Sequence, residues 1–510
     1  MTRRDFASLL ALPALAAPTA KGLSLNEDAN HFFVNRRAQR LTRESIAAWV
    51  PQYANTQVRE LILNVNAMRA AFASKTRDSF WTGFDPAQGP DQELLRAMPD
   101  PKARQVWFDW IRCAWQMEQD GLDLYGIWIP EIRRHRMSPW ISVRMNDLHD
   151  VDNERHPLHS SFWKQHPEFR RIPYRGEQRD KALDYSRPEV RAHNFTFIEE
   201  ICERYDFDTL ELDWMRHGFH FRPGFEAEGQ KILNTFHTEV RTLLNSWSKK
   251  RKHPIGLAVR VPGSPVTARL LGLNPAEWPV DFVTPTNFWR TVDTAMPIET
   301  WRRLLPKHVT LAAGLELGLN AFWGSVANGG RAWQSNSLES VRGAAAAYLH
   351  QGADRIYLFN YMDSDTTLDD PSGYPTLLRE CGELATLASK TRRHVITYQD
   401  TWAPGELPAG PLPADLAPTR WRAFRLATGP FDAKLKPIVW LGLKPSGAKL
   451  QVRCNGELCT PLEQVASRKP GPNTPCASFA AKNWHGGDSV IEVAAETDTH
   501  LEWVELELKA

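Results

Sequence analysis

Two acids in the stretch TLELDWMRHGFHF, residues 209–221, are the first candidates for chemistry. Leucine alternates there with Glu211 and Asp213, which is the period of a β-strand. Both carboxylates therefore share one face, and Asp213 stands at the carboxyl end of the run. Another acid, Glu316, comes near the end of a second apolar run, VTLAAGLEL.

Two carboxylates on opposite sides of a cleft suit cleavage of a glycosidic bond. One protonates the leaving oxygen, and the other attacks the anomeric carbon or activates water. We therefore predict Asp213 and Glu316 as the catalytic pair. Each has a simpler interpretation: Asp213 as a structural ion pair with an arginine, and Glu316 as a cap or a ligand for a sugar hydroxyl. Glu211, one layer deeper, is more typical of a buried brace.

The elements that must position these acids lie between residues 30 and 395, where short apolar runs alternate with amphipathic segments. Strands are predicted at 31–35, 59–65, 139–145, 209–215, 255–261, 280–286, 309–317 and 355–362. Helices are predicted at 103–119, 188–204, 226–249, 338–351 and 375–389. Eight strands alternating with helices indicate an α/β fold, a (β/α)8 TIM barrel spanning 30–395.

Barrel enzymes carry their reactive groups where the strands end and in the loops that follow. The residues predicted there to bind substrate are Arg144, Asn146, Asp147, His149, Trp214, Arg216, His217, Arg260, Asn287, Trp289, Asn360 and Tyr361. His217 and His220 follow Asp213 closely, but three-residue spacing on a loop is a weak metal signal. We expect no metal and no cofactor.

Arginine is abundant among these strand ends: Arg144, Arg216, Arg222, Arg260 and Arg290. A guanidinium binds a carboxylate or sulfate through two parallel hydrogen bonds. The simpler interpretation is that each arginine pairs with an acid of the protein itself. The arginines outnumber the acids that we place at the strand ends, which predicts an anionic glycan as substrate.

After residue 395 the composition and the hydrophobic periodicity of the chain change. Residues 396–419 are rich in proline and predict a linker. Residues 420–510 consist of short alternating runs separated by turns, which predict a small antiparallel β-sandwich. Three cysteines lie there, Cys454, Cys459 and Cys476, and an oxidising compartment would permit one disulfide among them.

The first 20 residues begin Met-Thr-Arg-Arg-Asp-Phe and continue into a short apolar segment. This pattern resembles a twin-arginine export signal, and the segment is too short for a stable membrane anchor. We therefore expect a periplasmic or secreted protein with no membrane anchor after cleavage. The 62 basic and 60 acidic residues nearly balance, so composition gives no reason to expect a nucleic-acid partner.

The stretches SVRMNDLHD, LDYSRPEVRAHNFTFIEEICERYDFDTLELDWMR and AVRVPGSPVTARLLGLNPAEW together resemble barrel glycoside hydrolases of the glycosyl-hydrolase-like, family 10-like group. The resemblance covers residues 30–395 and implies an acid/base on strand four, Asp213, and a nucleophile on strand seven, Glu316. On strand four this chain has Leu-Asp, whereas the glycosidases that this group resembles usually have Asn-Glu. LDWMR also resembles the strand-four nucleophile of α-galactosidase-type barrels, so the two roles are open to exchange. The C-terminal domain resembles β-sandwich modules that accompany such barrels.

The preferred hypothesis is a secreted glycoside hydrolase acting on a polysaccharide or oligosaccharide. A glycan-binding protein on an inactive barrel is the first alternative. A polysaccharide lyase is the second, because Tyr361, Arg216 and His217 are available for β-elimination. An esterase is disfavoured, since no G-x-S-x-G motif occurs.

Overall fold

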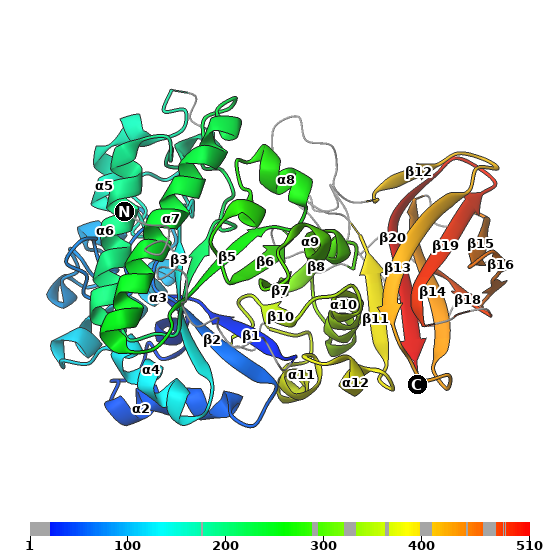
Figure 1. The fold of residues 1–510 in the computed structure, drawn as a ribbon, viewed down its shortest axis with the longest axis horizontal. Coiled ribbons are helices and arrows are strands. Elements are labelled where there is room, and N and C mark those ends of the chain that lie inside the picture. Colours follow the sequence, from blue (N-terminus) through cyan, green and yellow to red (C-terminus); the bar gives the residue numbers. More distant parts are fainter. Residues whose placement is uncertain are drawn as a thin grey trace, which may run out of the picture.

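The computed structural model describes residues 21–174, 177–287, 294–320, 333–362, 367–397, 411–444, 447–462, 476–482, 484 and 486–510. Its largest part is a closed barrel of parallel strands in the order β1-β10-β7-β6-β5-β4-β3-β2 (Figure 1). These strands are β1 Leu23–Glu27, β2 Val58–Asn64, β3 Ser138–Arg144, β4 Thr209–Asp213, β5 Gly256–Pro262, β6 Phe282–Thr286, β7 Thr310–Leu315 and β10 Arg355–Leu358. The predicted α/β fold, a (β/α)8 barrel, is confirmed.

The first strand is the one that sequence reasoning misplaced. The prediction of a strand at 31–35 is wrong, because those residues form α1 (His31–Asn35) and the strand is β1, eight residues earlier. In β1 the inward residues are polar: the Ser24 hydroxyl donates to Glu60 of β2 at 2.8 Å. Phe32 and Phe33 are both buried, which two neighbouring residues of a half-buried strand would not be.

Helices surround the barrel, and their ends follow from local signals. The helices are α1 His31–Asn35, α2 Arg43–Ala47, α3 Pro101–Gln119, α4 Leu124–Arg134, α5 Ser161–Gln165, α6 Pro188–Arg204, α7 Glu226–Arg251, α8 Pro265–Leu270, α9 Ile298–Leu304, α10 Leu338–His350, α11 Tyr374–Glu380 and α12 Leu384–Leu387. The longest, α7, begins with two glutamates and ends with three basic residues, as the helix dipole favours. The helix predicted at 375–389 is two helices, α11 and α12, separated at Gly382, which packs on the backbone of Gly22.

A β-sandwich follows the barrel. One sheet has the order β11-β20-β14-β18-β17, with β12 also paired to β20, and the other has the order β13-β19-β15-β16. The strands are β11 Arg392–Ile396, β12 Ala414–Leu416, β13 Arg422–Gly429, β14 Lys436–Lys444, β15 Leu450–Cys454, β16 Glu457–Leu458, β17 Thr460–Pro461, β18 Cys476–Ala480, β19 Gly487–Ala495 and β20 Thr499–Lys509. A separate hairpin pairs β8 (Gly318–Asn320) with β9 (Trp333–Ser335). The sandwich therefore takes β11 from the end of the predicted barrel segment and β12 from the predicted linker. Cys454, Cys459 and Cys476 are buried free thiols.

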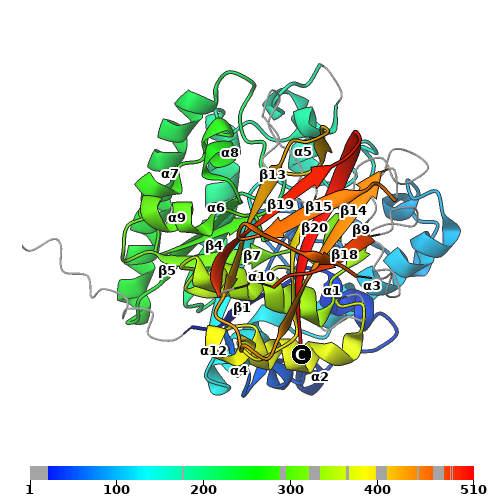
Figure 2. The same ribbon diagram turned by 90° about the vertical axis from the view of Figure 1, so that its right-hand side faces the viewer.

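The sandwich packs on the barrel through α10, as Figures 1 and 2 show from two directions. A Cβ on Gly343 of α10 would lie 1.8 Å from the carbonyl oxygen of Arg393 in β11, so glycine permits this close approach. The Arg393 guanidinium binds both oxygens of Glu505 in β20, at 2.8 and 3.0 Å. The Arg393 side chain also donates to Ser337, the N-cap of α10.

The predicted export signal, residues 1–20, lies outside the described residues. Among the helices that the structure describes, none is long and apolar enough to cross a membrane.

Candidate active site

Three charged residues stand side by side where β3, β4 and β5 end. Strand register places Arg144 opposite Asp213, and Asp213 opposite Arg260. Neighbours in a parallel register share a face of the sheet, so all three point into the mouth of the barrel. Each is at most 4% exposed. The local sequence achieves this by alternating each charged residue with an apolar one that faces the helices.

One buried guanidinium holds both predicted catalytic carboxylates. The Nε and Nη2 atoms of Arg260 donate to Asp213 at 3.0 and 3.1 Å, and its Nη1 lies 3.5 Å from Glu316 Oε1. The backbone N–H groups of Met215 and Arg216 also donate to Asp213 Oδ1, at 2.9 and 3.0 Å. Burial opposes the charge of Arg260, but the two carboxylates outweigh burial and raise the pKa of Arg260.

A second cluster of polar and charged side chains, Asp147, His149 and Arg216, lies beside the contacts of Arg260. His149 Nδ1 is 2.7 Å from Asp147 Oδ1, and His149 Nε2 contacts the Arg216 guanidinium. A guanidinium can only donate, so Nε2 accepts and Nδ1 donates to Asp147. Burial works against ionisation of Asp147, yet His149, Arg144 and Arg216 outweigh it and hold the pKa of Asp147 well below its usual value. These residues form a chain of charge-assisted hydrogen bonds.

Sequence reasoning missed Asp28, which follows β1. Arg144 Nη2 donates to Asp28 Oδ1 at 2.7 Å. Burial would raise the pKa of Asp28, but Arg144 and Arg216 lower it overall. The residue was missed because β1 was misplaced; the alternation of Leu23 and Leu25 with polar residues was the available signal.

Three side chains here could coordinate a metal by geometry alone. One ligand atom each from Asp147, His149 and His217 lie within 4.8 Å of one another. His217 has a left-handed backbone (φ 66°), and burial followed by Arg216 lowers its pKa far below the usual value. The guanidinium atoms of Arg144 and Arg216 lie 3.7 and 4.0 Å from Asp147. Two cations so close oppose a metal dication, so the cluster is better suited to hydrogen bonding.

Glu211 lies below Asp213 on the inward face of β4. Its Oε1 accepts from Ser142 at 2.7 Å and from Tyr357, on the other side of the barrel, at 2.9 Å. Burial first and the Asp213 charge second raise the pKa of Glu211 to about 7. The brace predicted for this acid is therefore made by two hydroxyls.

Three residues predicted to bind substrate have their side chains buried and bonded to other parts of the protein. Trp214 is fully buried on the outer side of β4, and its Nε1 donates to His237 of α7 at 3.0 Å. The Asn146 amide is occupied by three backbone groups of the surrounding loops. Tyr361 is fully buried, and its hydroxyl donates to the main-chain oxygen of Glu316 at 2.7 Å. All three shape the site from behind.

Two predicted asparagines lie at the mouth with their side chains half-buried. Asn360 follows β10 in a left-handed conformation, and no residue in the described part of the chain bonds its buried Oδ1. Asn287 follows β6 and lies against Gly263. Trp289 lies outside the described residues.

Comparisons with known proteins give structural matches only. No family model matches the chain, and neither does any curated protein. The PgaB (BpsB) glycoside hydrolase domain from Bordetella bronchiseptica is 10% identical over 71% of this chain and 99% of that domain, with a TM-score of 0.39. Alpha-L-fucosidase isoenzyme 1 from Paenibacillus thiaminolyticus is 12% identical, covers 93% and 97% of the two chains, and has a TM-score of 0.37. A cycloisomaltooligosaccharide glucanotransferase from Paenibacillus sp. is 9% identical with a TM-score of 0.35; this chain is covered to 96% and spans 57% of that one. At such scores the likeness carries no argument, and function must be argued from the site.

Proposed function

We propose that this protein hydrolyses glycosidic bonds at the carboxyl-end mouth of its barrel. The observation that carries this proposal is that one buried guanidinium, Arg260, touches both Asp213 and Glu316. Two carboxyl groups from β4 and the end of β7 are thereby held on either side of one charge. Two carboxyl groups at one barrel mouth are the kind of pair that glycoside hydrolases use. Membership of the family 10-like group and secretion remain predictions.

The contacts of the two acids favour different roles for them. Four N–H donors point at the oxygens of Asp213, two from Arg260 and two from the backbone. A carboxylate held in this way acts as a charged group, either stabilising the oxocarbenium-like transition state or attacking it. Glu316, which contacts Arg260 through one atom at 3.5 Å, is then left as the candidate acid/base, which exchanges the roles that the family resemblance implies.

Glycan binding without hydrolysis is the second candidate. The observation that favours it is that Asp213 is only 1% exposed and its oxygens are already bonded. The lyase alternative loses support, since the Tyr361 hydroxyl that would take part is buried and bonded to the protein itself.

The test is a product profile on a panel of polysaccharides, with the anomer of the released sugar followed by NMR. Asp213→Asn and Glu316→Gln should each lower kcat by about 10²–10⁴-fold, the usual value of a positioned acid or base. The matched controls are Asp120→Asn and Glu131→Gln. They alter the ion pairs Arg40–Asp120 and Arg134–Glu131, which lie on the outer helices. Retained affinity with no turnover by the unmodified protein would establish the binding function instead.

A more specific form of the proposal is that the substrate is an anionic glycan. Arg144, Arg222 and Arg260 already contact Asp28, Asp184 and Asp213 respectively, which removes most of the predicted excess of arginine. Arg216 is held less tightly by acids: its ion pair with Asp147 spans 4.0 Å, and one of its nitrogens donates to His149. Arg216→Lys should therefore reduce kcat/KM about ten- to hundredfold more for a uronic-acid polymer than for a neutral one. Equal losses would assign Arg216 to support of Asp147 and His149.

A further inference from the structure

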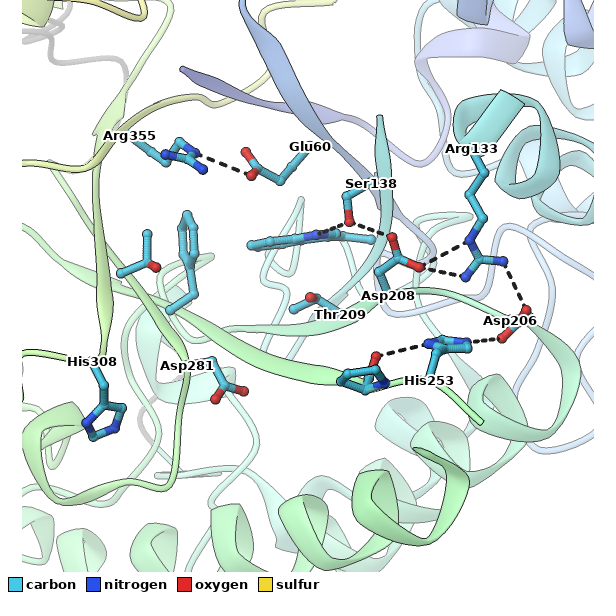
Figure 3. A pocket seen from close by; sticks show the side chains of 14 residues that line it. Glu60, Arg133, Ser138, Asp206, Asp208, Thr209, His253, Asp281, His308 and Arg355 are labelled. Atoms are coloured by element: carbon cyan, nitrogen blue, oxygen red, sulfur yellow. Dashed lines mark hydrogen bonds and ion pairs between the residues drawn. The ribbon is translucent and has the colours of Figure 1, made fainter. Parts of the chain in front are cut away.

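The opposite end of the barrel contains a large cavity that the proposed active site does not use. It has a volume of about 710 Å³ and opens between the amino ends of the strands (Figure 3). Binding sites for small molecules have this size, whereas the amino end of a barrel ordinarily serves stability. Along β4 the cavity residue Thr209 is four residues from Asp213, about 13 Å at the usual rise of a strand. The cavity and the mouth are therefore separate places.

Two hydroxyl groups in the cavity lack partners. Thr209 begins β4 and Thr310 begins β7, and both line the cavity. They are 7% and 8% exposed, and no described residue hydrogen-bonds either hydroxyl. Because both residues line the open cavity, their hydroxyls can bond a ligand or water there.

Apolar rings form another part of the wall. Trp140 of β3 and Phe282 of β6 both line the cavity, with ring centroids 4.8 Å apart and planes at 87°. Trp140 Nε1 donates to Ser138 Oγ at 3.0 Å, so the indole is fixed in place before any ligand arrives. A fixed aromatic surface beside free hydroxyls suits a molecule with an apolar face and hydroxyls at its edge.

The charges of the rim exclude an anionic ligand. Figure 3 shows them bonded mainly to one another: Arg355 contacts Glu60 at 3.3 Å, and Arg133 contacts both Asp206 and Asp208. Asp281 is a fourth acid in the lining, and it is paired with Arg241 of α7. Both guanidiniums of the lining are thus already paired with acids, so neither is left to hold a phosphate or a carboxylate. The paired carboxylates keep lone pairs that can accept hydrogen bonds from a polyol.

We propose that this cavity at the amino end of the barrel is a binding site for a carbohydrate ring without acidic groups. Thr209, Thr310 and the rim carboxylates hold its hydroxyls, and Trp140 and Phe282 contact its C–H face. The site binds whether or not the mouth hydrolyses glycosides, so it does not depend on the proposed activity.

The test uses the full chain with three methyl hexopyranosides (glucose, galactose and mannose) as neutral probes and glucuronate as the anionic probe. Binding is measured by saturation-transfer NMR titration, and the position by crystal soaking. Thr209→Val and Thr310→Val remove one hydroxyl each with little change of shape, and each should weaken the affinity for a neutral probe about three- to tenfold. The matched control is Thr284→Val, because Thr284 is a fully buried barrel threonine outside the cavity. Its affinity should equal that of the unmodified protein.

Turnover at the mouth is measured on Thr209→Val and Thr310→Val and should not change, which separates this proposal from the proposed activity. Preferential binding of glucuronate would overturn it. Equal affinities for Thr209→Val, Thr310→Val and Thr284→Val would overturn it, as would soaked crystals with water alone in the cavity.

Discussion

Replacement of Arg260 by methionine tests whether one guanidinium organises the mouth. The variant keeps a long side chain but leaves two carboxylates, Asp213 and Glu316, without the cation between them. Arg260 is 1% exposed and contacts Asp213 through two hydrogen bonds of 3.0 and 3.1 Å. Loss of one partner of a buried ion pair costs about 3–5 kcal/mol, because the other charge stays buried and unpaired. We expect a loss of this size in the free energy of unfolding.

The assay is equilibrium unfolding in urea, with Arg425→Met as the matched control. Arg425 also contacts two acids, Glu299 and Asp488, but its side chain is 52% exposed. Exposed pairs contribute about 0–1 kcal/mol, so the control should be nearly as stable as the unmodified protein. The double variant Arg260→Met with Asp213→Asn should recover about 1–3 kcal/mol, since the stranded charge is removed. Equal losses for Arg260→Met and Arg425→Met, with no recovery in the double variant, would refute the reasoning.

Three further predictions concern other parts of the chain. Glu211→Gln should flatten the dependence of stability on pH between pH 4.5 and about 7. The pKa of Glu211 in the folded protein, about 7, exceeds the ordinary 4.5, so the folded protein holds this proton more tightly than the unfolded chain does. The unmodified protein therefore loses up to ~3 kcal/mol of its free energy of unfolding as pH rises through that window. Urea unfolding across pH 4–8 measures the difference between variant and unmodified protein, and parallel curves would contradict it. A chain ending at Thr397 lacks β20, so β11 loses its neighbouring strand and the Arg393–Glu505 ion pair. It should have a lower Tm and a greater tendency to aggregate, while its folded fraction keeps turnover of small glycosides. A folded truncation with no turnover would count against this. Lysine at Arg3 and Arg4 should stop export, and cell fractionation that finds normal export would refute the twin-arginine assignment.

The barrel and the row of charges at its mouth were predictable because two simple periods determine them. Alternation along each strand identifies the inward residues, and parallel pairing aligns their ends. Asp213 and Arg260 followed directly. The same alternation places Trp214 outside the barrel, since its neighbour Asp213 points inward. Its prediction as a substrate contact gave the residue type more weight than its position.

Other parts of the site depend on contacts that no sequence period encodes. β1 was hidden because its inward side chains are polar, and Asp28 was lost with it. Asn146 looked like a substrate ligand, but loops distant in the sequence supply its three backbone partners. The cavity at the amino end is lined by side chains from six strands and from the segments that precede them. Such a cavity is visible only once the strands are assembled.

The inward face of β4 carries Thr209, Glu211 and Asp213 in succession, from the cavity to the mouth. Branched apolar side chains ordinarily fill a barrel interior, and a buried carboxyl is costly there. Glu211 has one oxygen, Oε2, that no described residue bonds. Its neighbours in register are Ser142, which donates to it, and Ala258, which leaves room beside it. Its pKa of about 7 means that it is neutral in mild acid and leaves Arg260 to Asp213 and Glu316. Once ionised, Glu211 adds a negative charge that is repelled by Asp213 and attracted by Arg260, so the charge balance below the mouth changes near pH 7.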